Sequence, residues 1–247
     1  MKKVLLAGES FIRHETHMKG FDTFHTTHYE ECANELQKAI KKAGYELDYL
    51  PSHLVPSKFP YTAEEMKEYS LIILSDIGAN SLHLSDDTFY KGKFLHNRTE
   101  EIAKYVKAGG SFLMIGGYLT FQGINAVGNY AQTAINDILP VEIQRVDDRM
   151  EMPEGVRGKT IKNHPILEGI SEWPRFLGYN KTFLRDDDTV EELATINGDP
   201  LIAIRECGKG KTAVFTSDCA PHWGSPEFMS WNLYDQMWGQ LIKWLAQ

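Results

Sequence analysis

Cysteine, long apolar runs and clustered positive charge are all scarce in this sequence of 247 residues. The three cysteines, Cys32, Cys207 and Cys219, are an odd number and lie far apart, which argues against a disulfide framework. No stretch reaches the roughly 18 apolar residues that cross a bilayer, and the apolar run at residues 4–8 ends at Glu9, too early for a signal peptide. We therefore expect a soluble, cytoplasmic protein.

The charge balance is acidic. The 26 Lys and Arg residues are outnumbered by 34 Asp and Glu residues, for a formal net charge of −8. Nucleic acids and anionic membranes repel such a chain, so we expect neither as a partner. Hydrophobic residues make up 42% of the sequence, which is enough for one large core. With no linker or repeat visible, residues 1–247 are interpreted as a single domain.

Strand and helix patterns alternate in the first half of the sequence. Short runs typical of strands in a parallel sheet lie at residues 4–8, 45–50, 71–74 and 111–115. Helical patterns lie between them at residues 27–43, 62–69 and 99–106. The first helix is supported by a capping box that begins at Thr27 and by Gly44 at its end. This order predicts an α/β fold with a three-layer, doubly wound, mostly parallel sheet.

The second half is less regular. Helices are predicted at residues 129–139 and 228–245. Strand patterns lie at residues 189–196, 201–205 and 211–216, of which the last two suit a hairpin. The aromatic stripe of the final helix is typical of packing on a core. Exposed aromatic residues near the C-terminus leave self-association into a homo-oligomer open.

Ligands of a parallel sheet bind at the carboxyl ends of its strands, and four predicted strands end in polar residues and glycines. These strand ends are residues 9–10, 75–80, 116–123 and 217–224. The candidate catalytic residues are His222, Tyr118 and Glu9, with Cys219 less favoured. The candidate ligand-binding residues are Ser10, His17, Lys19, Asp22, Asp76, Asn80, Gln122, Asp148, Arg149, Asp218 and Trp223. A small molecule is the expected ligand.

Four histidines lie before and at the start of the first predicted helix, as the pairs His14/His17 and His25/His28. This spacing can place two imidazoles on one face, as a metal site requires. No matching Cys or His spacing follows, so a polar loop with hydrogen-bonded imidazoles is favoured. We expect neither a metal nor a cofactor.

Gly116-Gly117-Tyr118 follows a predicted strand in the setting of a nucleophile elbow. Tyrosine, with an ordinary pKa near 10, is a poor acyl-transfer nucleophile. Tyr118 is therefore either an aromatic plug or a hydroxyl that donates to a substrate. Cys219 could pair with His222 as nucleophile and base, oriented by Asp218, although a free cysteine is often just a small buried hydrophobe.

Asp147, Asp148 and Glu151 surround Arg149 in the sequence. Such a group is usually solvated charge on the surface. Alternatively, Asp148 and Arg149 reach over the edge of the sheet as an electrostatic clamp. Both interpretations stay open at this point.

Taken in order, several of these stretches resemble the glutamine amidotransferase-like proteins, relatives of the class I glutamine amidotransferases. The matching stretches are residues 8–10, 17–22, 75–80, 114–123, 147–155 and 217–224. The resemblance implies a flavodoxin-like α/β fold over the full chain. It also implies a cysteine at the elbow, where this sequence has Tyr118. A late His-x-Glu motif is implied as well, but His222 is followed by Trp223-Gly224 and not by x-Glu. The resemblance thus reflects ancestry, and glutaminase activity is not expected.

Two functions are compatible with these residues. The first is a small-molecule enzyme of hydrolase type acting on an amide, ester or sugar-like ligand, with His222 or Glu9 as general base. The second is a non-catalytic ligand-binding or assembly protein that retains the fold. A closed pocket with a perturbed acid–base pair favours the first, and an open or plugged edge favours the second.

Overall fold

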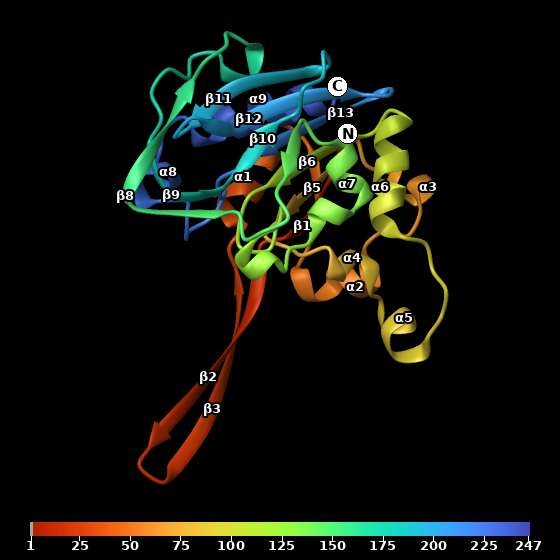
Figure 1. Ribbon diagram of the computed structural model, residues 1–247, viewed down its shortest axis with the longest axis vertical. Helices are drawn as coiled ribbons and strands as arrows, with labels where there is room; N and C mark the ends of the chain where they lie inside the picture. Colours follow the sequence, from red (N-terminus) through yellow and green to blue (C-terminus); the bar gives the residue numbers. More distant parts are fainter. Residues whose placement is uncertain (1) are drawn as a thin grey trace.

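One mixed sheet organises the chain in the computed structural model, which describes residues 2–247. Within these residues its nine strands lie in the order β4-β1-β5-β6-β13-β12-β11-β8-β9 (Figure 1). The parallel strands are β4 (Glu46–Leu50), β1 (Lys3–Gly8), β5 (Leu71–Ser75), β6 (Ser111–Ile115) and β13 (Gly210–Phe215). The antiparallel strands are β12 (Asp199–Cys207), β11 (Val190–Ile196), β8 (Arg149–Thr160) and β9 (Arg175–Asn180).

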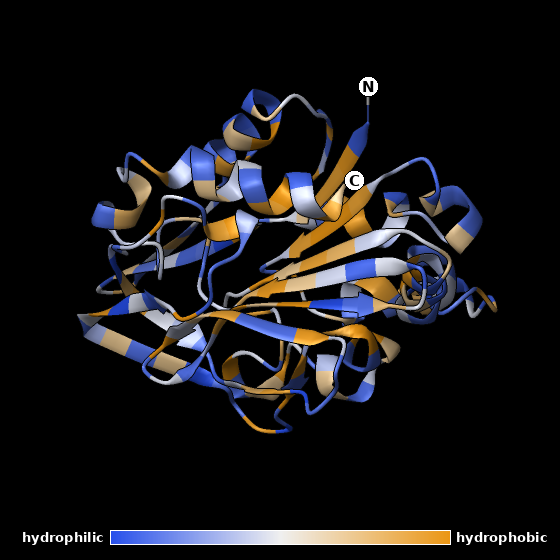
Figure 2. Cartoon of the chain, turned by 90° about the horizontal axis from the view of Figure 1, so that it is seen from above, coloured by the Kyte–Doolittle hydropathy of each residue, from blue (hydrophilic) through white to orange (hydrophobic). Residues whose placement is uncertain are grey.

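Helices cover both faces of the parallel strands. One face packs against α1 (Asn34–Lys42) and α9 (Tyr234–Leu245). The other packs against α2 (Val55–Lys58), α3 (Ala63–Met66), α6 (Arg98–Lys107) and α7 (Ala134–Ile138). Burial on both faces explains why β5 and β6 are continuous apolar runs rather than alternating ones. Figure 2 shows these apolar strands between the helices.

Shorter elements complete the described chain. The short helices are α4 (Asn80–His83), α5 (Asp86–Lys91) and α8 (Pro226–Met229). The 3-10 turns are η1 (Ser52–Leu54), η2 (Ile124–Ala126), η3 (Tyr130–Gln132) and η4 (Pro165–Leu167). A small antiparallel pair joins β7 (Val141–Ile143) to β10 (Thr182–Leu184). No helix among residues 2–247 is long and apolar enough to cross a membrane.

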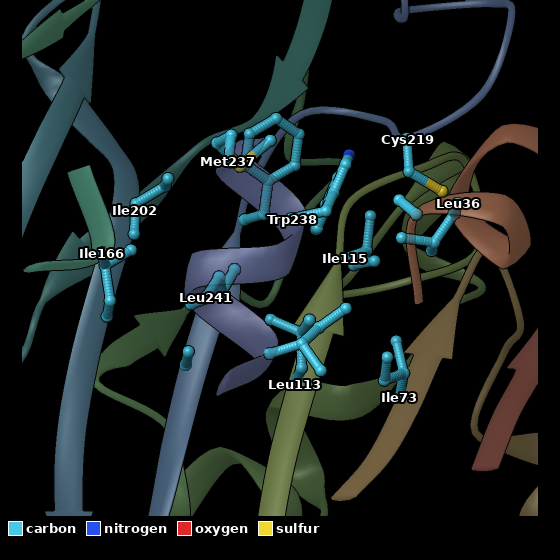
Figure 3. Close-up of a cluster of buried hydrophobic side chains, with 14 of the residues drawn as sticks. Leu36, Ile73, Leu113, Ile115, Ile166, Ile202, Cys219, Met237, Trp238 and Leu241 are labelled. Carbon is cyan, nitrogen blue, oxygen red and sulfur yellow. The ribbon is translucent and has the colours of Figure 1, made fainter. Parts of the chain in front are cut away.

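The prediction of a mostly parallel sheet is confirmed for the first half and for β13, but four neighbouring strands are antiparallel. The expected hairpin of residues 201–216 is confirmed as β12 and β13. The helix expected at 129–139 is instead the turn η3 followed by α7. The last helix is divided into α8 and α9, and Trp238 of its aromatic stripe is fully buried in the core (Figure 3).

The helix predicted to begin at Thr27 is wrong. Residues Ser10–Lys19 and Asp22–Glu31 form strands β2 and β3, an antiparallel hairpin of ten cross-strand pairs. Thr27 does not cap a helix, because its hydroxyl lies 3.0 Å from His14 Nδ1 across the hairpin. The β-branched and aromatic residues of this stretch favour a strand once a partner strand is present. The helix begins only at Asn34.

Gly8, at the end of β1, is a sensitive position in this fold. An added Cβ would collide with the Ser75 carbonyl oxygen, and the φ of +112° is strained for any other residue. We expect Gly8→Ala to lower the free energy of unfolding by about 3 kcal/mol or more in urea denaturation. Gly198→Ala is the matched control, since Gly198 also has a positive φ but no atom within 4 Å. Gly198→Ala should lower the free energy of unfolding by only about 1 kcal/mol. Equal losses in the two variants would contradict the close approach at Gly8.

Candidate ligand-binding and catalytic site

A cavity of about 540 Å³ lies at the carboxyl ends of the parallel strands. Four carboxyl side chains line it: Glu9 after β1, Asp76 after β5, Asp218 after β13, and Glu30 from the base of the hairpin. Cys32, Tyr118 and His222 line the same cavity. The predicted convergence of several strand ends on one site is therefore seen in the geometry. No Lys or Arg is among the lining residues of the described chain.

The backbone bends sharply where these strands end. Glu9, Asp76 and Phe121 have φ values of 50°, 43° and 52°, and His222 has 142°. Residues other than glycine seldom adopt such angles, which cost free energy and often occur at functional sites. The bends turn the Glu9 and Asp76 side chains into the cavity.

Burial controls the protonation of the carboxyl groups. Desolvation, helped by the neighbouring Asp218 and Asp76, raises the pKa of Glu9 well above its ordinary value. Burial likewise raises the pKa of Asp76 and raises that of Asp218 to about 6. The shift favours the protonated form of Glu9, which can therefore serve as a proton donor.

His222 contacts one of these carboxyls and two aromatic rings. Its Nδ1 lies 3.7 Å from Asp218 Oδ2. Its ring packs edge-on against Tyr118, with 4.2 Å between centroids, and stacks on Trp223 at 5.3 Å. Asp218 and the rings thus orient an imidazole that faces the cavity. Such an arrangement suits a general base.

Cys219 is unsuited to act as a nucleophile. Its thiol is buried, 3.5 Å from Glu9 Oε2 and 3.5 Å from Ser75 Oγ. Burial and the neighbouring Glu9 and Asp218 raise its pKa well above the ordinary value, so a thiolate is disfavoured. Figure 3 shows Cys219 among the apolar side chains of the core.

The elbow after β6 is held by close contacts. A Cβ on Gly117 would collide with the Asp76 side chain, whose Oδ1 accepts a hydrogen bond from Leu119 N at 2.7 Å. The Asn180 side chain pairs with the backbone of Gly117, accepting from its N at 2.9 Å and donating to its O at 3.1 Å. These contacts place Tyr118 at the wall of the cavity.

The Tyr118 hydroxyl already has a partner. It donates to Glu151 Oε1 at 2.7 Å, while Trp223 Nε1 donates to Glu151 Oε2 at 3.1 Å. The Arg149 guanidinium lies over the Tyr118 ring, 4.8 Å from its centroid, and also pairs with Asp147 at 2.8 Å. Tyr118 therefore presents its ring, rather than its hydroxyl, to His222. Arg149 contacts the outer side of this wall.

Asp148 does not form a clamp over the edge of the sheet. Its buried carboxyl accepts hydrogen bonds from the backbone N of Gln122 and Gly123, both at 2.8 Å, and from Asn180 Nδ2 at 2.9 Å. Gln122 is buried as well, with its side chain bonded to Ala126 and Ala131. The clamp interpretation of Asp148 is wrong, because the loop after the elbow needs these acceptors. Asp148 and Gln122 thus hold the loop after the elbow in place and do not line the cavity.

Several other predicted ligand-binding residues lie outside the cavity. Ser10 accepts a hydrogen bond from Ser52 N at 2.8 Å, and Asn80 is exposed at the start of α4. Trp223 lies behind Tyr118 and is fully buried. The remaining three are on the hairpin, beyond reach of this chain's own cavity: His17, Lys19 and Asp22.

Of the lining residues that sequence reasoning missed, three lie outside the four predicted strand ends: Phe11, Glu30 and Cys32. They come from the base of the hairpin, and Cys32 lies within the helix predicted at residues 27–43, which begins only at Asn34. Burial raises the pKa of the Cys32 thiol to about 11, so it is not activated either. A stronger weight on the Thr, Phe and Tyr content of residues 22–31 would have indicated the hairpin.

The hairpin carries His14 and His17 on β2 and His25 and His28 on β3. Three of them contact threonine hydroxyls across the hairpin, as His25 Nδ1 does Thr16 Oγ1 at 3.1 Å, and His28 lies 3.9 Å from Glu15. Among the described residues, one group of three metal-ligand types converges elsewhere: Glu9, Asp218 and Cys219, with atoms within 4.8 Å of one another. A cation there would have to displace the protons that burial holds on Glu9 and Cys219. This group therefore suits a protonated cluster better than a metal centre.

The fold and the cavity define an α/β protein with a carboxyl-lined cavity at the carboxyl edge of its sheet. A family model described as "Putative glutamine amidotransferase" matches residues 3–247. The chain therefore belongs to the glutamine amidotransferase-like family, which confirms the resemblance seen in the motifs. A search of curated protein sequences finds no significant match.

Two solved structures from Salmonella typhimurium are similar over the whole chain. The cytoplasmic protein STM1381 of strain LT2 is 42% identical, with 99% of this chain and 100% of that chain covered and a TM-score of 0.95. The cytoplasmic protein STM3548 is 44% identical, with 98% of each chain covered and a TM-score of 0.94. A ThuA-like protein from Bacteroides uniformis, 13% identical over 97% of this chain and 89% of that chain, shares the fold alone at a TM-score of 0.57.

The raised pKa of Asp218 predicts a pH-dependent cost in stability. The folded state binds this proton with a pKa of about 6, against an ordinary 3.8, so stability falls as pH rises between these values and stays lower above them. Asp218→Asn cannot ionise and retains an oxygen for Ala220 N. We expect it to be more stable than the wild type at pH 7–8 by roughly 1–3 kcal/mol, with the gain vanishing near pH 4.

Urea denaturation at several pH values measures this difference. Asp188→Asn is the matched control, because the same substitution is made at an exposed carboxylate. A destabilised Asp218→Asn protein at pH 8 would contradict the argument.

Proposed function

We propose that this protein is a small-molecule hydrolase-type enzyme that acts by general acid–base catalysis at the carboxyl edge of its sheet. One observation carries the proposal: the Glu9 carboxyl and the Asp218-supported His222 imidazole face the same cavity. The raised pKa of Glu9 makes it the acid, and the imidazole of His222, oriented by Asp218, is the base. This is the pairing that hydrolysis of an unactivated bond requires.

In this mechanism His222 removes a proton from water, and the water oxygen attacks the electrophilic carbon of the substrate. Glu9 donates its proton to the leaving group as the bond breaks, and the proton on His222 then restores Glu9 through solvent. The carboxylate of Asp218 stabilises the imidazolium that forms. Both oxygen and protons come from water, so no further reactant is needed.

The lining indicates the class of substrate. Four carboxyls and the absence of a lining Lys or Arg in the described chain disfavour an anionic ligand. A neutral amide, ester or sugar-like molecule, or a cation, fits better. The cavity volume of about 540 Å³ suits a small ligand.

Glutaminase activity is not part of this proposal. The elbow carries Tyr118, and the buried thiol of Cys219 is held protonated. We also propose that the fold is of the three-layer, flavodoxin-like type, from the strand order β4-β1-β5-β6-β13. The chain then acts as a single domain. A cytoplasmic location is supported by the names of the two Salmonella relatives.

A second candidate is a non-catalytic ligand-binding protein. The observation in its favour is that Tyr118 is held in place at the wall of the cavity. Its hydroxyl donates to Glu151, and its ring lies against the Arg149 guanidinium. Binding of a neutral ligand by calorimetry, together with no turnover, would favour this candidate over the enzyme.

Glu9→Gln and His222→Gln each test the catalytic roles. We expect both to lower kcat by about 10²–10⁴-fold on a panel of chromogenic esters, amides and glycosides, because each removes a proton-transfer group. His164→Gln is the matched control and should leave kcat unchanged, because His164 precedes the 3-10 turn η4 and does not line the cavity. The wild-type rate should rise through about pH 6 as Asp218 ionises. Full turnover by His222→Gln would exclude this mechanism.

Cys219→Ser tests the loss of the amidotransferase mechanism. We expect the wild type to release no ammonia from glutamine and the variant to keep the hydrolase rate within about twofold, since the thiol is protonated and outside the cavity lining. Ammonia release is measured by a coupled dehydrogenase assay. Glutaminase activity that disappears in the variant would overturn this interpretation.

A further inference from the structure

The elbow after β6 bears on the kind of bond that this site can hydrolyse. In a nucleophile elbow, the backbone N–H of the residue after the nucleophile position helps to form the oxyanion hole. Tyr118 holds the nucleophile position here, so the corresponding donor is the N–H of Leu119. That N–H already donates to Asp76 Oδ1 at 2.7 Å. A carboxyl group of the protein therefore lies where the oxyanion of an ester or amide substrate would have to bind.

The N–H on the other side of the elbow is also engaged. Gly117 N donates to Asn180 Oδ1 at 2.9 Å. The Asp76 side chain lies directly against the elbow backbone, because a Cβ on Gly117 would come within 2.7 Å of its Oδ1. Acyl transfer depends strongly on oxyanion donors, since the loss of one such donor lowers kcat by about 10²–10³-fold. The elbow is thus poorly suited to stabilise negative charge on a substrate.

The inner wall of the cavity is suited to positive charge. Its described lining residues include Glu9, Asp76 and Asp218 but no Lys or Arg. Glu9 is only 4% exposed, and within residues 2–247 its Oε1 has no hydrogen-bond partner, while Oε2 accepts from the Cys219 thiol at 3.5 Å. Buried carboxyl oxygens normally have partners. The free oxygen at the cavity wall therefore indicates that a polar group of the ligand completes this site.

Two aromatic rings, those of Phe11 and Tyr118, belong to the same lining. Aromatic faces provide apolar contact area, and their negative quadrupole attracts a nearby cation. A ring-shaped ligand with C–H groups on its faces and positive charge at its reacting atoms suits both the rings and the carboxyls.

We propose that the bond cleaved at this site is the acetal C–O bond of a sugar-like substrate, and that Asp76 stabilises the positive charge that develops at the acetal carbon. This inference rests on the proposed function and selects one substrate class within it. Acetal hydrolysis passes through an oxocarbenium-ion-like transition state, whereas ester and amide hydrolysis pass through an oxyanion. The occupied elbow donor and the carboxyl-lined wall favour the first over the second.

The step uses the acid and the base already assigned. The acetal C–O bond breaks with its electron pair on the leaving oxygen, which takes the proton of Glu9. The ring oxygen shares a lone pair with the acetal carbon as positive charge develops there. Water forms the new C–O bond and gives a proton to His222. One water is consumed, the products are a hemiacetal and an alcohol, and Asp76 forms no bond and takes no proton.

A charged and an uncharged sugar mimic test this assignment without turnover. The probes are 1-deoxynojirimycin and its galacto and manno epimers, whose ring nitrogen takes up a proton, and the corresponding lactams, which keep the hydroxyls but stay neutral. We expect the wild type to bind at least one of the iminosugars at least about tenfold more tightly than its lactam in calorimetry at pH 6.5. Equal binding within every pair, or no binding of any iminosugar, would overturn the proposal.

Asp76→Asn tests the residue that carries the charge. Asparagine keeps an oxygen for Leu119 N and tolerates the φ of 43° at this position, so the elbow should stay intact. We expect the variant to reduce the preference for the iminosugar to less than about threefold. Asp188→Asn, at an exposed carboxylate, is the matched control and should keep the preference. An unchanged preference in Asp76→Asn would exclude this role of Asp76.

Turnover separates this inference from the proposed function. We expect the wild type to hydrolyse 4-nitrophenyl glycosides of at least one configuration faster than 4-nitrophenyl acetate, and Asp76→Asn to lower kcat on the glycoside by about 10²-fold. Enzymatic hydrolysis of the ester or of 4-nitroanilides, with none of the glycosides, would overturn the acetal assignment and leave the proposed hydrolase intact. Turnover of none of these substrates, together with tight iminosugar binding, would overturn the proposed catalysis and leave the preference for positive charge.

Discussion

The close approach of backbone at the carboxyl ends of the parallel strands is the constraint on which the site depends. A Cβ on Gly8 would collide with the Ser75 carbonyl, and one on Gly116 would collide with that of Thr216. With no side chains at these positions, neighbouring strands end close together. The next residues, among them Glu9 and Asp76, must then turn through positive φ.

Crowding three carboxyls into this space has an electrostatic consequence. Burial raises the pKa of Glu9, Asp76 and Asp218, and the neighbouring carboxyls raise those of Glu9 and Asp218 further. Burial of these carboxyls lowers the stability of the fold at neutral pH. The same burial places the Glu9 carboxyl and the oriented His222 imidazole in one cavity. At the elbow, by contrast, the buried side chains of Asp148 and Asn180 have hydrogen-bond partners. Rigid support therefore surrounds a strained centre.

Much of this organisation is predictable from local patterns, and the errors have a common origin. The buried strands β5 and β6 and the strand-end positions of Glu9, Asp76, Asp218 and His222 follow from apolar runs and from the geometry of parallel sheets. The hairpin was missed because Thr27 and Glu30 also fit a helix start, and only pairing with residues 10–19 selects the strand. Asp148 was misplaced because nothing local indicates that Gln122 and Gly123 need its oxygens.

The sequence by itself determined the α/β class, the acidic character, the family and the missing elbow cysteine, because these depend on residue identity and short-range periodicity. The tertiary structure alone decided the protonation of Glu9, the partners of Tyr118 and the projection of the β2–β3 hairpin. Each of these depends on residues far apart in the chain. Desolvation and strand pairing are properties of surroundings, and a linear pattern does not specify them.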